Sequence, residues 1–181
     1  MHHSLRRPQS VPSFVRPLMA SLALAFAAAV AQAAPVADVH ALAQKEQQPL
    51  LDTLRDLVHI ESGSKDIEGL NQIAERIASQ LKQLGGTVDV LQTSDIYRLD
   101  DTPEKVGPAV QAVFKGTGSK KIMLIAHMDT VYLKGMLKGQ PFRIDGDKAY
   151  GLGISDDKQG IALIIHTCLL YTSDAADDSL R

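Results

Sequence analysis

The sequence predicts an α/β fold, because helical and strand-like patterns alternate along it. Residues 50–58 and 70–84 place apolar side chains at the three- and four-residue spacing of amphipathic helices. Residues 87–91, 109–114 and 122–126 carry the alternating or continuous apolar side chains that are typical of strands. Helices that alternate with strands in this way indicate an α/β sheet.

Local signals mark where the two helices end. The first helix is expected to stop at Glu61-Ser62-Gly63-Ser64. The second is expected to stop at Gly85-Gly86, since glycine accepts a positive φ. Its apolar stripe consists of Leu70, Ile73, Ile77, Leu81 and Leu84.

The second half of the chain predicts a turn, a hairpin and a helix. Residues 116–119 form a tight turn and not a phosphate loop, because a strand follows instead of a lysine and a helix. Residues 141–144 and 148–150 are expected to pair as a hairpin about Asp145-Gly146-Asp147. Residues 157–167 are apolar all round, so this helix is expected to be buried.

The first 33 residues have the features of a secretory signal peptide. Three arginines precede an apolar run at residues 18–31, and residues 31–33 fit an A-x-A cleavage site, which places cleavage before Ala34. A membrane anchor is the alternative, but the run of 14 residues is shorter than the roughly 20 that cross a bilayer. We therefore expect a periplasmic or secreted protein, with no membrane contact after the signal is removed.

Charge and cysteine content exclude two further features. Residues 1–33 contain three arginines and no acidic residue, so the remainder has 16 basic and 21 acidic residues and a formal charge of −5. Nothing basic enough to bind nucleic acid remains. The single cysteine, Cys168, excludes an intramolecular disulfide.

His127 and Asp129 follow the apolar run at residues 121–126, two positions apart, so on a strand their side chains leave the same face. Ligands of open α/β sheets gather beyond the carboxyl ends of strands, and imidazole and carboxylate groups suit Zn²⁺. An isolated pair of this kind is more often a strand-end histidine and a loop-starting acid. Asp156 alone is likewise an ordinary residue with which to open a helix.

The wider pattern around these residues resembles the di-zinc exopeptidase family that contains aminoacylases, succinyl-diaminopimelate desuccinylase and glutamate carboxypeptidase. The similarity runs from about Gln48 to Thr167 and follows the glutamate carboxypeptidase pattern most fully. It is carried by Leu57–Gly63, Ala126–Gly135, Pro141–Arg143, Gly146–Gly151 and Asp156–Lys158.

The resemblance implies roles for three residues and a metal. His127 would ligate one of two Zn²⁺ ions, and Asp156 would bridge both. Asp129, counted with the catalytic residues, would hold the His127 ring by a hydrogen bond. The resemblance also implies a cis peptide bond between Asp156 and Asp157.

The resemblance further implies parts that we cannot locate in the chain: the general-base glutamate, the remaining metal ligands, and the lid or dimerisation domain. We expect a signal peptide at residues 1–33 and, at residues 34–167, the N-terminal part of an incomplete mixed-sheet zinc-exopeptidase catalytic domain. Residues 168–181 depart from the family pattern and resemble translated adapter sequence. A natural acidic tail is the alternative for this segment.

The function implied for an intact protein is that of an exported, zinc-dependent exopeptidase of glutamate carboxypeptidase type, which hydrolyses a C-terminal amide or peptide bond. Its substrate would be a small peptide, an N-acyl amino acid or a folate-like conjugate, and the full-length protein would be a homodimer. The present chain is expected to be an inactive fragment. Two alternatives remain: an aminoacylase or dipeptidase of the same family, or a non-catalytic exported α/β binding module.

Overall fold

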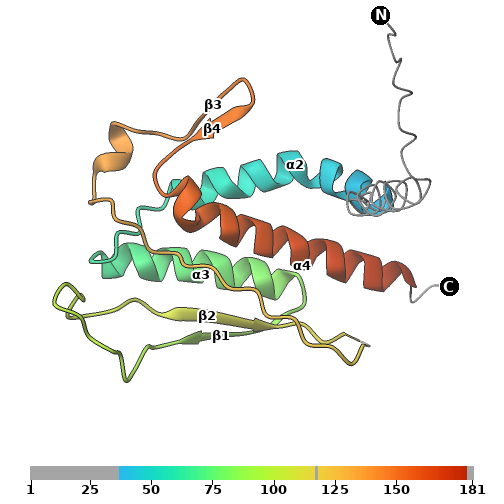
Figure 1. Ribbon diagram of the computed structural model, residues 1–181, viewed down its shortest axis with the longest axis horizontal. Helices are drawn as coiled ribbons and strands as arrows, with labels where there is room; N and C mark the ends of the chain where they lie inside the picture. Colours follow the sequence, from blue (N-terminus) through green and yellow to red (C-terminus); the bar gives the residue numbers. More distant parts are fainter. Residues whose placement is uncertain (1–36, 117, 179–181) are drawn as a thin grey trace, which may run out of the picture. The chain divides into compact units, whose positions relative to one another are not determined.

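The computed structural model describes residues 37–116 and 118–178, and Figure 1 shows the elements that they form. The predicted signal segment and its cleavage position before Ala34 lie outside the described residues. The described residues from Ala41 onward belong to one compact unit, and the core and the site described below belong to it. Among the described residues, no helix combines the length and apolar character that crossing a bilayer requires.

Three helices supply the core. They are α2 (Ala37–Val58), α3 (Ile67–Gln83) and α4 (Gln159–Asp178). From residue 41 onward, α2 runs roughly beside α3 and α4 in Figure 1. Their apolar faces meet in one buried cluster, which consists of Leu54, Leu57, Val58, Ile73, Ile77, Leu81, Ile161, Ala162 and Ile165. The two apolar stripes predicted for the first helices therefore face the core.

Two helix boundaries and one burial pattern differ from the prediction. α2 begins at Ala37, well before the apolar stripe, in a stretch rich in the strong helix formers alanine and glutamine. α4 continues past Thr167 to Asp178. The expectation that this helix is buried all round is wrong, because Leu163 is 53% exposed. Only one face of α4 meets the other helices of the core.

The strands form two separate antiparallel pairs. β1 (Thr87–Leu91) pairs with β2 (Ala109–Val113), and their inner side chains pack against the helical core. β3 (Arg143–Asp145) pairs with β4 (Lys148–Tyr150), which confirms the predicted hairpin. Helices and strands are mixed as the α/β class requires, but the described strands do not join into one sheet.

The strand predicted at residues 122–126 is wrong, since no described strand pairs with this segment. Its side chains are largely open to solvent: Ile122 is 86% exposed, and Met123 and Ile125 are each 79% exposed. A strand requires a neighbour that exchanges backbone hydrogen bonds with it. The apolar pattern predicted the tendency to form a strand but could not supply the partner.

Candidate metal centre

The three residues selected from the sequence lie together. Nε2 of His127 is 2.8 Å from Oδ1 of Asp156, and Nδ1 is 3.1 Å from Oδ1 of Asp129. His127 and Asp156 are 29 positions apart, so their contact depends on the folding of the chain. Both nitrogens of the imidazole ring thus face a carboxylate.

All three side chains are open to solvent, with exposed fractions of 49% for His127, 46% for Asp129 and 72% for Asp156. Burial by itself lowers the pKa of His127. Hydrogen bonds to Asp156 and Asp129, together with their negative charges, outweigh this effect, so the pKa of His127 lies above its ordinary value. The surroundings of the ring therefore favour a positive charge.

A sharp change of backbone direction brings Asp156 to His127. Gly153 has a φ of +73°, and a Cβ there would lie 2.5 Å from Cγ2 of Thr130, so the position suits glycine. The short helix η2 (Ile154–Lys158) that follows is interrupted by non-helical backbone at Asp156 and Asp157. The peptide bond between these two residues is cis, as the resemblance implied.

The loop between α2 and α3 holds the segment that follows His127, at Thr130. The backbone N–H of Thr130 donates to the carbonyl of Ser62 at 2.8 Å, and the N–H of Ser64 donates to the carbonyl of Thr130 at 2.9 Å. Gly63 forms a parallel bridge with Thr130. A Cβ at Gly63 would collide with the carbonyl oxygen of Tyr132, so this close approach requires glycine.

Two serine hydroxyls of this loop reach the same segment. Oγ of Ser62 donates to the carbonyl of Met128 at 2.7 Å, and Oγ of Ser64 donates to Oδ2 of Asp129 at 2.7 Å. The first hydrogen bond fixes the backbone at Met128 to the α2–α3 loop. The second reaches a side chain of the candidate metal centre.

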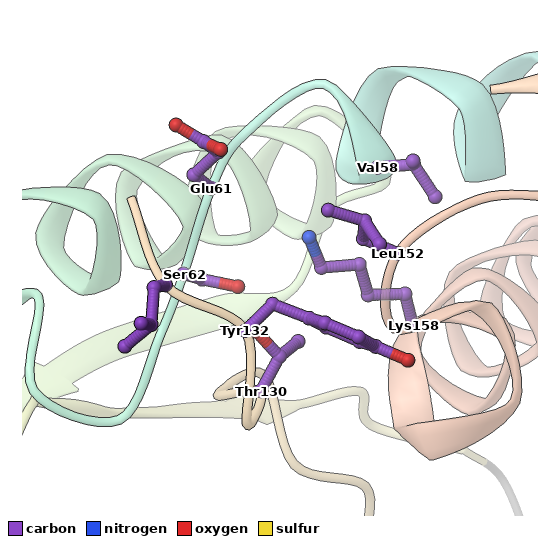
Figure 2. A pocket seen from close by; sticks show the side chains of 8 residues that line it. Val58, Glu61, Ser62, Thr130, Tyr132, Leu152 and Lys158 are labelled. Atoms are coloured by element: carbon purple, nitrogen blue, oxygen red, sulfur yellow. The ribbon is translucent and has the colours of Figure 1, made fainter. Parts of the chain in front are cut away.

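Lys158, the residue directly before α4, anchors the loop between α2 and α3. Its side chain is buried, with 1% exposed, and Nζ donates to the carbonyl of Ile60 at 2.7 Å. Burial lowers the pKa of Lys158 to about 8, against the opposing charge of Glu61. Figure 2 shows Lys158 extending from the start of α4 toward the loop that carries Glu61 and Ser62.

The pocket in Figure 2 lies beside the candidate metal centre and does not contain it. It is lined by Val58, Glu61, Ser62, Thr130, Tyr132, Leu133, Leu152 and Lys158. Glu61 accepts hydrogen bonds from the N–H groups of Leu137 and Gly135 at 2.9 and 2.8 Å, which lower the pKa of its carboxyl. We interpret the residues that line this pocket as the support of the α2–α3 loop.

Sequence reasoning missed Ser64 as a neighbour of Asp129 and left His166 without a role. His166 is buried, and its Nδ1 and Nε2 contact Glu46 at 2.7 Å and Thr53 at 2.9 Å. Ser64 lies just past the family-like segment that ends at Gly63, and nothing local links it to Asp129. His166 has no metal-like spacing to another residue, so no sequence signal marked it.

The donors present fit part of a zinc site. His127 offers one nitrogen and Asp156 one oxygen, and these two atoms point at each other from different segments. Within the described ranges, no three or more His, Cys, Asp or Glu side chains converge as a metal-binding group. Zinc sites in proteins usually have about four ligands, so these residues account for a part of one.

Comparison with known proteins shows that part of the chain matches a peptidase family. Residues 123–177 match the model of "Peptidase family M20/M25/M40". This match confirms the family that the sequence predicted. The M20/M25/M40 segment includes His127, Asp129 and Asp156, and it extends past Thr167 to residue 177.

A curated relative extends the similarity along most of the chain. The chain is 42% identical over 161 residues to Carboxypeptidase G2 from Pseudomonas sp. (strain RS-16). The aligned region covers 88% of this chain but 37% of the relative. The chain therefore spans well under half of the length of this relative.

Proposed function

We propose that this chain contributes part of the active site of a zinc-dependent exopeptidase of carboxypeptidase type, which hydrolyses a C-terminal amide or peptide bond. The observation that carries the proposal is the contact of Nε2 of His127 with Asp156 at 2.8 Å, with Asp129 on the opposite ring nitrogen. The match to a peptidase family and the 42% identity to a carboxypeptidase support it.

Each residue has a distinct task in this proposal. His127 would supply a nitrogen donor and the Asp156 carboxylate would supply oxygen donors to the two ions. Asp129 would accept a hydrogen bond from Nδ1–H of His127, so that the neutral ring keeps its proton on Nδ1 and leaves Nε2 free to bind a cation. The chemistry that zinc would supply when held by these residues is polarisation of the scissile carbonyl and a lowered pKa of a water molecule.

We further propose that the chain is a portion of a larger catalytic protein. The coverage of 37% of the relative supports this organisation. Residues 34–167 would form the N-terminal part of a mixed-sheet catalytic domain, with further ligands, the general base and a lid or dimerisation domain supplied elsewhere. The substrate would be a small peptide, an N-acyl amino acid or a folate-like conjugate, and the complete protein would be a homodimer.

Export is the proposed route of the protein to the periplasm or the medium. The apolar run at residues 18–31 and the cleavage pattern before Ala34 support it. Intact mass of the product from a secreting host checks this proposal. A membrane-bound product that retains residues 1–33 would contradict it.

Zinc binding by the full chain tests the metal centre. We expect the chain to bind zinc in an equilibrium titration and His127→Ala to lose this binding. His59→Ala is the matched control, because His59 is also an exposed histidine, but its ring contacts a backbone carbonyl, that of Arg55, instead of a carboxylate of the described residues. A folded chain that binds no zinc, or that binds it equally without His127, would favour the non-catalytic binding module.

Hydrolysis by the same chain tests how much of the site it holds. We expect no release of glutamate from a folate analogue in the presence of zinc, because His127 and Asp156 are fewer donors than a catalytic zinc site uses. Zinc-dependent release of glutamate by this chain would contradict the proposal that it holds only part of the site.

A further inference from the structure

One side-chain hydrogen bond ties the candidate metal centre to the α2–α3 loop. Oγ of Ser64 donates to Oδ2 of Asp129 at 2.7 Å, while Oδ1 of the same carboxylate lies 3.1 Å from Nδ1 of His127. We propose that Ser64 is a positioning residue: it fixes the Asp129 carboxylate so that the His127 ring presents Nε2 toward Asp156. This inference rests on the proposed function.

The Asp129 carboxylate needs a second point of attachment. The terminal torsion of an aspartate side chain is broad and roughly two-fold, so a single contact with His127 leaves the plane of the carboxylate free to turn. Asp129 is also 46% exposed, so water competes for its oxygens. A hydroxyl at 2.7 Å from a charged oxygen makes a strong hydrogen bond and sets that plane.

Ser64 is itself held firmly enough to act in this way. Its N–H donates to the carbonyl of Thr130 at 2.9 Å, and its hydroxyl lies 3.1 Å from that carbonyl oxygen. A hydroxyl has one proton to donate, and the charged oxygen of Asp129 is closer. Lys158 holds the start of the same loop through Ile60.

Ser62 provides a control within the same loop. Its hydroxyl donates to the carbonyl of Met128 at 2.7 Å, the same length as the Ser64 hydrogen bond, but it contacts backbone and no side chain of the metal centre. Ser62 is buried, with 1% exposed. Loss of its hydroxyl leaves a part-buried carbonyl without this partner, so Ser62→Ala is expected to destabilise the fold without turning the His127 ring.

The first measurement is the tautomer of His127 in the full chain without metal, from imidazole ¹⁵N shifts at a pH where the ring is neutral. Because Asp156 faces Nε2 and competes for the ring proton, we expect a mixture of tautomers in the wild type, with a larger share of the Nδ1–H form than in Ser64→Ala. Ser64→Thr keeps the hydroxyl and should restore the wild-type mixture of tautomers. Ser64→Val has nearly the shape of threonine without the hydroxyl and should not.

The second measurement is the zinc dissociation constant of the same variants. Loss of the Ser64 hydroxyl should weaken zinc binding about 10-fold, at the lower end of the effect usual for groups that orient a metal ligand. Ser64→Thr should bind as the wild type does. Ser62→Ala should lower the midpoint of denaturation while keeping the wild-type mixture of tautomers and zinc affinity.

The outcomes separate this inference from the proposed function. Unchanged tautomer and zinc affinity in Ser64→Ala and Ser64→Val, in a chain that binds zinc through His127, would overturn the inference and leave the function standing. Equal effects of Ser62→Ala and Ser64→Ala on the ring would also overturn it, because the loop as a whole would then act. If the wild type binds no zinc, the function fails, and the tautomers still decide the role of Ser64. If Ser64→Ala does not fold, the Thr and Val variants give the answer.

Discussion

His127 and His166 have the same kind of partner at Nδ1 and different kinds of partner at Nε2. In each, Nδ1 contacts a carboxylate, Asp129 at 3.1 Å and Glu46 at 2.7 Å. At Nε2, His127 faces a second carboxylate, that of Asp156, at 2.8 Å. The corresponding atom of His166 faces a hydroxyl instead.

The two histidines also differ in burial. The side chain of His166 is 8% exposed and joins α4 to Glu46 and Thr53 of α2, whereas the side chain of His127 is 49% exposed. A buried imidazole needs a partner for each nitrogen, and a neutral hydroxyl meets this need. Two carboxylates around an open imidazole concentrate negative charge where a cation can reach it. The partners of a histidine thus distinguish a structural residue from a candidate metal ligand.

The largest expected effect is the loss of metal in Asp156→Ala. This change removes the oxygen that faces Nε2 of His127 and the only carboxylate proposed to contact both ions. Metal per chain should fall to background by elemental analysis, while Glu46→Ala, at the other histidine, should retain the wild-type zinc content. A wild-type zinc content in Asp156→Ala would contradict the distinction drawn between His127 and His166.

Asp129→Ala should have a smaller effect, because Asp129 contacts His127 and not the proposed metal position. Loss of such a partner usually weakens metal affinity by roughly 10- to 100-fold. The variant should therefore bind zinc at saturating concentration with a raised dissociation constant in a titration. Complete loss of zinc at saturation would place Asp129 among the ligands themselves.

His166→Ala should change stability and not metal binding. It leaves Glu46 and Thr53 without their shared partner between α2 and α4, which should cost about 1–3 kcal/mol in the free energy of unfolding. Denaturant titration measures this cost, and the exposed control His59→Ala should stay within about 0.5 kcal/mol of the wild type. Loss of zinc in folded His166→Ala would erase the distinction between the two histidines.

The smallest expected effect concerns Glu61, a carboxylate held by backbone N–H groups instead of an imidazole. Hydrogen bonds from the N–H groups of Leu137 and Gly135 lower the pKa of its carboxyl below the ordinary value of a glutamate. Its contribution to stability is therefore present above the unfolded pKa and is lost as pH falls through the lower, folded pKa. Glu61→Gln should flatten this part of the pH dependence in denaturation midpoints measured below pH 4.5, and an unaltered acid profile would contradict this role.

The sequence predicted α3 and the hairpin of β3 and β4 because their signals act over a few residues. The stripe from Leu70 to Leu81 needs only helical spacing, and it lies buried as expected. Gly146, with a φ of 59°, allows the tight turn of the hairpin. The segment at residues 122–126 had an equally clear apolar pattern, but a strand also needs a partner, which a local pattern does not contain.

The sequence by itself determined which side chains form the candidate centre, since family resemblance preserves the chemistry of His127, Asp129 and Asp156. Only the tertiary structure decided how these side chains are held. It placed Ser64 against Asp129 across 65 positions of sequence, and it buried His166 between α2 and α4. Hydrogen bonds of this range depend on how helices and loops pack, and packing is a property of the whole folded unit, so no short stretch of sequence encodes them.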